Sequence, residues 1–156
     1  MFKHSPYLES SKRLADVMAA IQYLATHKFG SRTVENWSGS IGSSPKSADS
    51  WKTLFEEHPE FFRVKEGYVA LVWRRANQKN FNMDTGKTHS KEQIKALSSD
   101  EKKLITRKPL EPAQTEALLN SAIQMHAAAI AHKKEFRWWI PLIASLLGVV
   151  VGAILK

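Results

Sequence analysis

Apolar side chains recur at helical spacing near the N-terminus of the chain and predict a first helix. Ser10 and Ser11 precede it and suit the N-cap position, and Gly30 follows it and permits a left-handed C-terminal turn. The predicted buried face is formed by Leu14, Val17, Met18, Ile21, Leu24 and Ala25. We therefore expect a helix over most of the stretch from 12 to 29.

Two shorter helical segments follow. Residues 31–33 have extended character, and residues 34–41, which include Trp37, predict a second helix. A third helix begins near Ser47 and ends at His58, because proline at the next position disfavours helix at the residue before it. Its apolar side chains are Trp51, Leu54 and Phe55.

The next stretch predicts a β-hairpin. Residues 61–65 and 68–75 are rich in aromatic and branched side chains, and Glu66-Gly67 separates them as a two-residue turn. This turn pairs Val64 with Val69 and Phe62 with Leu71. One face of the hairpin is then apolar and contains Phe62, Val64, Val69, Leu71 and Trp73. The other face is basic and contains Arg63, Lys65, Tyr68 and Arg74.

Helix, short strand, helix, helix and hairpin, in this order, is the winged-helix arrangement. The run WKTLFEEHPEFFRV, residues 51–64, resembles the third helix and first wing strand of LOTUS-type winged helices. The resemblance implies a winged-helix fold that binds RNA or protein partners, and it implies no catalytic residues. It covers residues 10–75 at the level of the fold motif.

The middle of the chain predicts a loop and two short helices. Residues 77–89 show no periodicity and form the loop. Ser90 with Gln93, and Ser98 with Glu101, both fit a capping box at the start of a basic helix. We interpret residues 77–110 as a solvated or partly packed helical neck.

A long helix is predicted from Pro112 up to Ile140, a stretch without another proline or any glycine. It carries a narrow stripe of mostly small and apolar residues that suits close helix contact. The predicted stripe consists of Leu118, Ala122, Met125, Ala129, His132 and Phe136.

Residues 138–155 contain no charged side chain and predict a transmembrane helix, since eighteen residues span roughly 27 Å. We expect Trp138 and Trp139 to lie at the membrane interface, and Lys133, Lys134 and Arg137 to stay on the cytoplasmic side. Residues 1–11 lack the features of a signal peptide, so a tail anchor is predicted.

The same apolar segment predicts self-association. Gly148 and Gly152 form a GxxxG pattern, and Ala144 extends this small-residue face by one turn, which lets helix backbones approach closely. Simple flexibility or lipid packing is the alternative explanation. A conducting pore is not expected, because Ser145 is the one polar side chain in the segment.

Composition limits the chemistry. The 156 residues include no cysteine, which excludes disulfides and a catalytic thiol. The six histidines form no metal-binding pattern, and no nucleophile, base and orienting group fall together. Residues 84–88, DTGKT, match fragments of a phosphate loop and of an aspartic-protease triplet but lack their flanking elements, so a turn is the better interpretation. We predict no enzyme, cofactor, metal or catalytic residue.

The net charge of +8 favours attraction to an anionic membrane surface, and nucleic acid is not needed to explain it. The third helix is a poor nucleic-acid reader, because Asp49, Glu56 and Glu57 stand against Lys52. The hairpin is the better candidate for nucleic-acid or protein binding, through Arg63, Lys65, Tyr68, Arg74 and Arg75.

Together these patterns predict an α+β, mainly α fold: an N-terminal winged helix, a helical neck and a single C-terminal transmembrane helix. The expected segments are 1–76, the winged helix; 77–110, the loop and neck; 111–137, the amphipathic juxtamembrane helix; and 138–156, the anchor.

The predicted function is binding of a protein or nucleic-acid partner at a membrane, by a homo-oligomer with a cytoplasmic N-terminal domain, the bacterial inner membrane being favoured. The alternative is a membrane-disrupting effector of the toxin or antiviral type.

Overall fold

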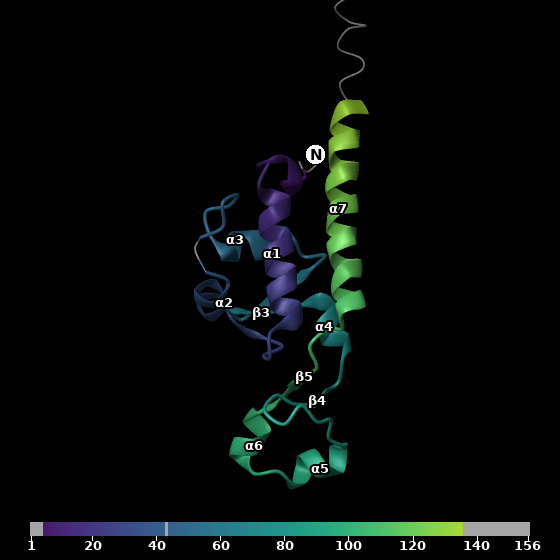
Figure 1. Cartoon of the computed structure of the whole chain (residues 1–156). Coiled ribbons are helices and arrows are strands. Elements are labelled where there is room, and N and C mark those ends of the chain that lie inside the picture. The colour runs from purple at the N-terminus through teal and green to yellow at the C-terminus, as the bar shows by residue number, and fades with distance from the viewer. Residues whose placement is uncertain (1–4, 43, 136–156) are drawn as a thin grey trace, which may run out of the picture.

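The computed structural model describes residues 5–42 and 44–135, which form an α+β fold (Figure 1). The elements are, in chain order, η1 (Pro6–Leu8), α1 (Arg13–Thr26), β1 (Arg32–Thr33), α2 (Val34–Ile41), α3 (Trp51–Glu57), β2 (Phe62–Lys65), β3 (Tyr68–Leu71), α4 (Val72–Ala76), β4 (Lys79–Asn82), α5 (Lys91–Ala96), α6 (Ser99–Lys103), β5 (Ile105–Arg107) and α7 (Pro112–Glu135).

The first half of the chain contains the three predicted helices and the predicted hairpin in the predicted order. Strands β1, β3 and β2 form an antiparallel sheet in that spatial order. The pairing of Phe62 with Leu71 and of Val64 with Val69 confirms the predicted register. Glu66 and Gly67 both have positive φ, 53° and 78°, which is the backbone geometry of a tight two-residue hairpin turn.

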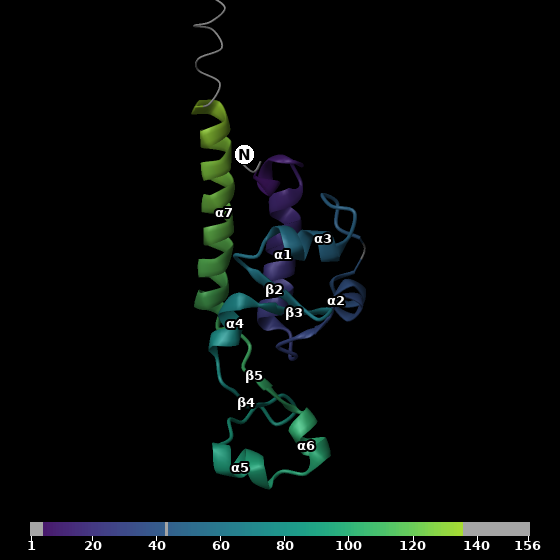
Figure 2. The same ribbon diagram turned by 180° about the vertical axis from the view of Figure 1, so that it is seen from behind.

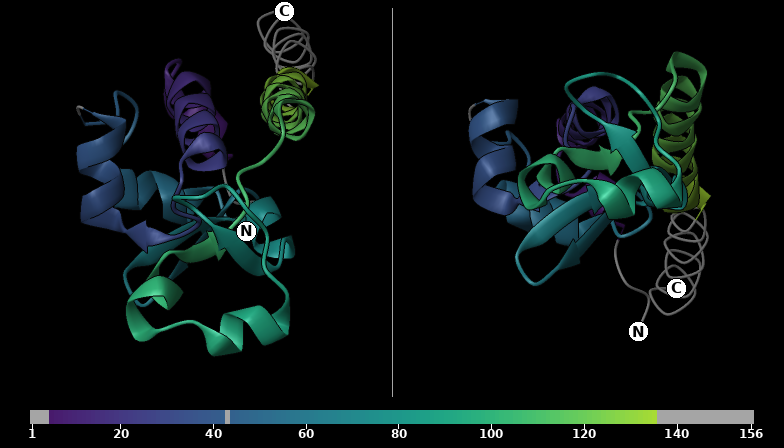
Figure 3. Two further views of the ribbon diagram at one scale, coloured as in Figure 1. Left: turned by 60° about the horizontal axis from the view of Figure 1, so that its bottom comes forward. Right: turned by 90° about the horizontal axis from the view of Figure 1, so that it is seen from below.

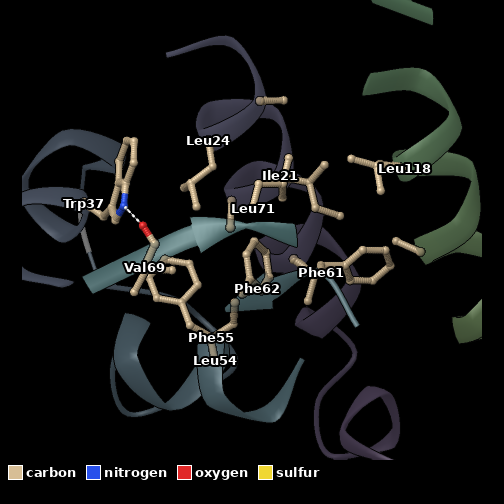
Figure 4. Close-up of a cluster of buried hydrophobic side chains, with 14 of the residues drawn as sticks. Ile21, Leu24, Trp37, Leu54, Phe55, Phe61, Phe62, Val69, Leu71 and Leu118 are labelled. Atoms are coloured by element: carbon tan, nitrogen blue, oxygen red, sulfur yellow. Dashed lines mark hydrogen bonds between the residues drawn. The ribbon is translucent and has the colours of Figure 1, made fainter. Parts of the chain in front are cut away.

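The core of this half lies between the sheet and its helices (Figure 4). The indole Nε1 of Trp37 donates a hydrogen bond to the carbonyl oxygen of Val69 at 2.9 Å, which fixes α2 to β3. The apolar side chains around this bond come from every neighbouring element and include Ile21, Leu24, Leu54, Phe55, Phe62 and Leu71, all fully buried. These are the inward positions of the helical and strand periodicities, so burial follows the sequence pattern here.

Residues 77–110, which we call the basic lobe, form a second part of the described chain (Figures 1 and 2). Strands β4 and β5 pair antiparallel, and α5 and α6 lie on the side of this pair away from α1. Capping boxes begin both helices, at Ser90 with Gln93 and at Ser98 with Glu101, as predicted. The strand pair was not predicted, because the sequence shows a loop and helices there.

Helix α7 returns from the basic lobe and packs along α1 (Figures 1 and 3). Leu118 and Ala122, two members of the predicted stripe, are fully buried in the core. Met125, a third member, is 41 % exposed, so the buried face of α7 does not follow the predicted stripe throughout. The backbone N–H of Leu110 donates to the Ala25 carbonyl oxygen at 2.9 Å and joins the start of α7 to α1.

The N-terminal turn η1 also contacts α7. Tyr7 is buried, and its ring lies edge-on to His58 at 4.7 Å and to His126 of α7 at 5.8 Å between ring centroids. Burial raises the pKa of the Tyr7 hydroxyl, and the Glu60 carboxylate adds to that rise. The chain before α1, the end of α3 and α7 therefore meet in one aromatic cluster.

The predicted fold class, a winged helix followed by a neck and a single transmembrane helix, is contradicted by this structure. In the part of the chain that the structure describes, no helix is both long enough and apolar enough to cross a bilayer. The longest one, α7, has polar side chains such as Glu116, His126 and Lys133 among its alanines, and it packs on protein. The segment 138–156, on which the prediction depended, lies outside the described residues.

Candidate nucleic-acid interface

The outer face of the hairpin carries the side chains that the strand alternation directs away from the core. Phe62, Val69 and Leu71 point inward and are buried, whereas Arg63, Lys65 and Tyr68 are exposed. Lys65 lies directly opposite Tyr68 in the register, so an ammonium group and an aromatic ring share one cross-strand pair. Arg63, Lys65 and Tyr68 of the predicted basic face are therefore exposed, whereas Ala70, which pairs with Arg63, is buried.

Two further exposed apolar side chains follow beyond the end of β3, in α4. Tyr68 is 53 % exposed, Trp73 is 45 % exposed, and Val72 between them is also exposed. Exposed large apolar groups scattered singly need no explanation, but here three of them fall within six consecutive residues. Such a concentration is typical of a surface that contacts a partner.

Three cations accompany these side chains. Arg63 and Arg75 are exposed and take part in no ion pair within the described ranges, 5–42 and 44–135. Lys65 lies 3.4 Å from the Glu66 carboxylate, but both side chains are well exposed, so water and salt screen that pair. The positive charge of this surface is thus available to an anionic partner. We call the set Arg63, Lys65, Tyr68, Val72, Trp73 and Arg75 the hairpin surface.

Arg74 and Trp73 are exchanged relative to the sequence prediction. The prediction placed Trp73 on the apolar inner face and Arg74 on the basic outer face, with the strand continuing to residue 75. Strand β3 instead ends at Leu71 and α4 begins at Val72, so the two-residue alternation stops there. Arg74 is fully buried and cannot contact a partner, which corrects its assignment as a binding residue.

The buried Arg74 guanidinium binds backbone rather than a carboxylate. Its Nη1 atom donates to the carbonyl oxygens of Leu24 and Phe29, both at 3.0 Å, and to that of His27. Its Nη2 atom donates to the carbonyl oxygens of Lys28 and Arg107 at 3.1 and 2.8 Å. Burial lowers the pKa of Arg74 to about 10, and the positive charge of Arg107 contributes to the shift. The group satisfies carbonyls at the end of α1 and holds β5 beside them.

The third helix offers little to an anionic partner. Glu57 pairs with the buried Arg13 of α1, and Lys52 lies 4.0 Å from Glu56 on the same helix. The charge of α3 is therefore used within the protein or balanced on its own surface. This supports the sequence interpretation that the hairpin, rather than α3, is the better candidate for nucleic-acid contact.

The remaining predicted site residues lie near or beyond the end of the described chain. Lys133 is exposed in the last turn of α7, and Lys134 belongs to the same helix. The other predicted interface and oligomerisation residues, Arg137, Trp138, Trp139, Ala144, Gly148 and Gly152, lie outside the described residues. In ranges 5–42 and 44–135, no three His, Asp or Glu side chains lie close enough together to hold a metal ion.

Sequence reasoning missed the exposure of Trp73 and assigned Val72 to neither face of the hairpin. The sequence contained one indication of this: Trp73 is followed by two arginines, and this pattern fits a short amphipathic helix as well as it fits a strand. Comparison with known proteins adds no further guidance: no family model, curated protein or solved structure matches the chain.

Proposed function

We propose that this protein is a non-enzymatic binding module that holds single-stranded nucleic acid on its hairpin surface. The observation that carries the proposal is the combination of two exposed aromatic rings, Tyr68 and Trp73, with Arg63 and Arg75, two cations that form no ion pair with any residue that the structure describes. Proteins that bind single strands combine stacking rings with positive charge along the backbone track.

A single strand fits this surface better than a duplex does. Bases of a single strand are free to stack on aromatic side chains, whereas a duplex hides the faces of its bases. Duplex readers of the helix-turn-helix type place a helix in the major groove, and here α3 has its cations offset by carboxylates. The exposed rings therefore favour unpaired bases as the partner.

Charge supports the same assignment. A protein that neutralises phosphates with Lys and Arg binds more weakly as salt rises, with a slope of roughly 0.7 per phosphate contact on a single strand. The hairpin surface has Arg63, Lys65 and Arg75 for this purpose. Binding should consequently depend strongly on ionic strength and only weakly on sequence.

Binding of a fluorescent single-stranded oligonucleotide to the full chain tests the proposal. Tyr68→Ala removes a stacking ring and should weaken binding by about 1–3 kcal/mol. The charge reversal Arg63→Glu with Lys65→Glu should weaken it further and reduce the salt slope. Lys12→Glu with Lys52→Glu, which makes the same change of net charge just before α1 and on α3, is the matched control and should have a much smaller effect.

Two results would contradict the proposal. One is an equal loss of affinity in the hairpin double variant and in the control double variant, because binding would then depend on the net charge of the protein and not on the hairpin surface. The other is an affinity for duplex equal to that for single strand at the same salt concentration. Capture of a protein by the hairpin surface without oligonucleotide binding would instead favour a protein partner.

A further inference from the structure

A pocket of about 470 Å³ opens in the basic lobe. It lies between β4 and the start of α5, which are labelled in Figures 1 and 2. Strand β4 and the residue before it provide one wall, and the start of α5 provides the other. The main lining residues are Gln78, Lys79, Asn80, His89, Lys91 and Ile94. We propose that this pocket binds the phosphate group of a small organic phosphate monoester.

Charge is the first reason for an anionic ligand. The lining includes two lysines, Lys79 and Lys91, and no acidic residue. Two carboxylates lie beside it: Glu92 accepts from the hydroxyl of the lining residue Ser90 at 2.8 Å, and Glu101 accepts from the Ser98 backbone N–H at 2.8 Å and interacts electrostatically with His89. Both carboxylates are exposed, so water and salt screen them, and the lining itself has an excess of positive charge.

A neighbouring pocket provides a contrast. It has a volume of about 340 Å³ and shares Gln78 and Asn80 with the first pocket. Its lining includes both Lys108 and Glu111, and these two side chains form an ion pair. The lining of that pocket therefore has one acidic and one basic group and no excess positive charge, unlike the lining at Lys79 and Lys91.

Hydrogen-bonding groups favour phosphate over a carboxylate ligand. A phosphate monoester carries a charge of about −1.5 to −2 at neutral pH and three strong acceptor oxygens, which suits two ammonium groups and side-chain amides together. Asn80 and Gln78 supply amides, and their contact with each other, at 3.4 Å, is weak. The Nε2 atom of His89, a lining residue, is buried and makes no hydrogen bond to any described residue. The wall thus holds polar atoms whose hydrogen bonds are incomplete.

Volume indicates that the ligand is larger than inorganic phosphate. Pockets for small organic molecules measure roughly 300–1,000 Å³, and this one falls in that range. Ile94 and the ring of His89 provide a less polar wall beside the lysines. A sugar or a base attached to the phosphate would occupy the space that the anion leaves.

A titration of the full chain tests this site. The ligands are a nucleoside monophosphate, the corresponding nucleoside and inorganic phosphate, and binding is followed by calorimetry and by the NMR signals of the His89 ring. The monophosphate should bind and shift the His89 signals, the nucleoside should not bind, and inorganic phosphate should bind more weakly than the monophosphate. Lys79→Glu with Lys91→Glu should reduce affinity about tenfold or more, because charge-assisted hydrogen bonds are lost.

Lys87→Glu with Lys95→Glu is the matched control. Both residues are lobe lysines outside the pocket lining, and the change of net charge is the same. Equal loss in the two double variants would overturn the proposal, as would binding of the nucleoside as tightly as the monophosphate. If the glutamate variant does not fold by circular dichroism, Lys79→Gln with Lys91→Gln provides the same comparison, and unchanged affinity in it overturns the site.

A competition arm separates a free phosphate monoester from the phosphodiesters of a nucleic-acid strand. A single-stranded oligonucleotide that displaces the monophosphate identifies a strand, and monophosphate binding that persists at saturating oligonucleotide identifies a free ligand. Arg63→Glu with Lys65→Glu should leave monophosphate affinity unchanged. Failure of the hairpin proposal is therefore distinguishable from failure of this one.

Discussion

The guanidinium of Arg74 donates a hydrogen bond to the backbone carbonyl oxygen of Arg107 at 2.8 Å. Arg107 is the last residue of β5, so this bond joins the basic lobe to the helical half of the protein. The same guanidinium binds four carbonyls around the end of α1. One buried side chain thereby holds together three segments that are far apart in the sequence.

Replacing Arg74 by methionine should destabilise the protein strongly. The substitution leaves buried carbonyl groups without donors, and hydrogen bonds to charged groups contribute about 1.5–3 kcal/mol each before relaxation. We expect a loss of about 3 kcal/mol or more in the free energy of unfolding, measured by urea denaturation. Arg75→Met, one residue away and exposed, is the control and should change stability by less than about 0.5 kcal/mol. Equal effects of the two variants would mean that the Arg74 contacts do not stabilise the fold.

Trp37 and Trp73 should respond differently to the same substitution. Trp37→Phe removes the hydrogen bond to the Val69 carbonyl and leaves unfilled space in the core, at a cost of about 2–3 kcal/mol. Trp73→Phe changes an exposed ring and should cost little. Thermal unfolding of both phenylalanine variants measures this difference in stability. In a separate binding measurement, Trp73→Ala should lower the affinity for the oligonucleotide, because it removes a ring that stacks on a base. A stable Trp37→Phe variant would contradict the assignment of Trp37 to the core.

Two glycines give opposite expectations. The backbone N–H of Gly30 donates to the Thr106 hydroxyl at 3.0 Å, and a Cβ at this position would meet that oxygen at 3.3 Å and the Arg107 Cβ at 3.4 Å. Gly30→Val should therefore push β5 away and cost about 1–3 kcal/mol, with faster amide hydrogen exchange in β4 and β5. Gly39 of α2 has open space around its Cβ position, so Gly39→Ala should stabilise by about 0.5–1 kcal/mol. Unchanged exchange in β5 of the Gly30→Val variant would show that this contact is not needed.

Stability should fall as the pH drops through the ordinary range of histidine. Burial lowers the pKa of His27, with further contributions from Arg32, Arg74 and Lys28, and its Nδ1 atom accepts the Phe29 backbone N–H at 3.1 Å. Because the unfolded chain binds this proton more readily, stability is present above about pH 6.5 and is lost below it.

Equilibrium unfolding measured across this pH range tests the prediction. The His27→Gln variant should show a flatter pH dependence of stability, whereas His132→Gln, at an exposed position of α7, should keep that of the parent protein. The pKa values of Glu92 and Glu101 are also lowered, but they affect stability in a more acidic pH range. A carboxylate with a lowered pKa stabilises the folded protein above its ordinary pKa of 4.5, and this stabilisation is lost as the pH falls below that value. Identical curves for His27→Gln and the parent would contradict the role of His27.

Agreement between prediction and structure is closest where the signal is local. The order of the first three helices, the register of the hairpin and both capping boxes follow from spacing, from the Glu66-Gly67 turn and from residues three positions apart. Such features are determined by interactions within a few residues, so the sequence pattern contains them directly.

Outcomes that depend on distant partners were not predictable. Ser98 and Glu101 show that the sequence alone determines where α6 begins, whereas the pairing of β4 with β5 requires two segments on either side of α5 and α6 to meet. The exchange of Trp73 and Arg74 depends on the carbonyls that α1 and β5 present to Arg74, and the buried face of α7 depends on α1. Local propensity depends on residues within one or two turns of the chain, whereas burial depends on which surfaces the tertiary structure brings together. For this reason Arg74, a predicted binding residue, lies inside the protein.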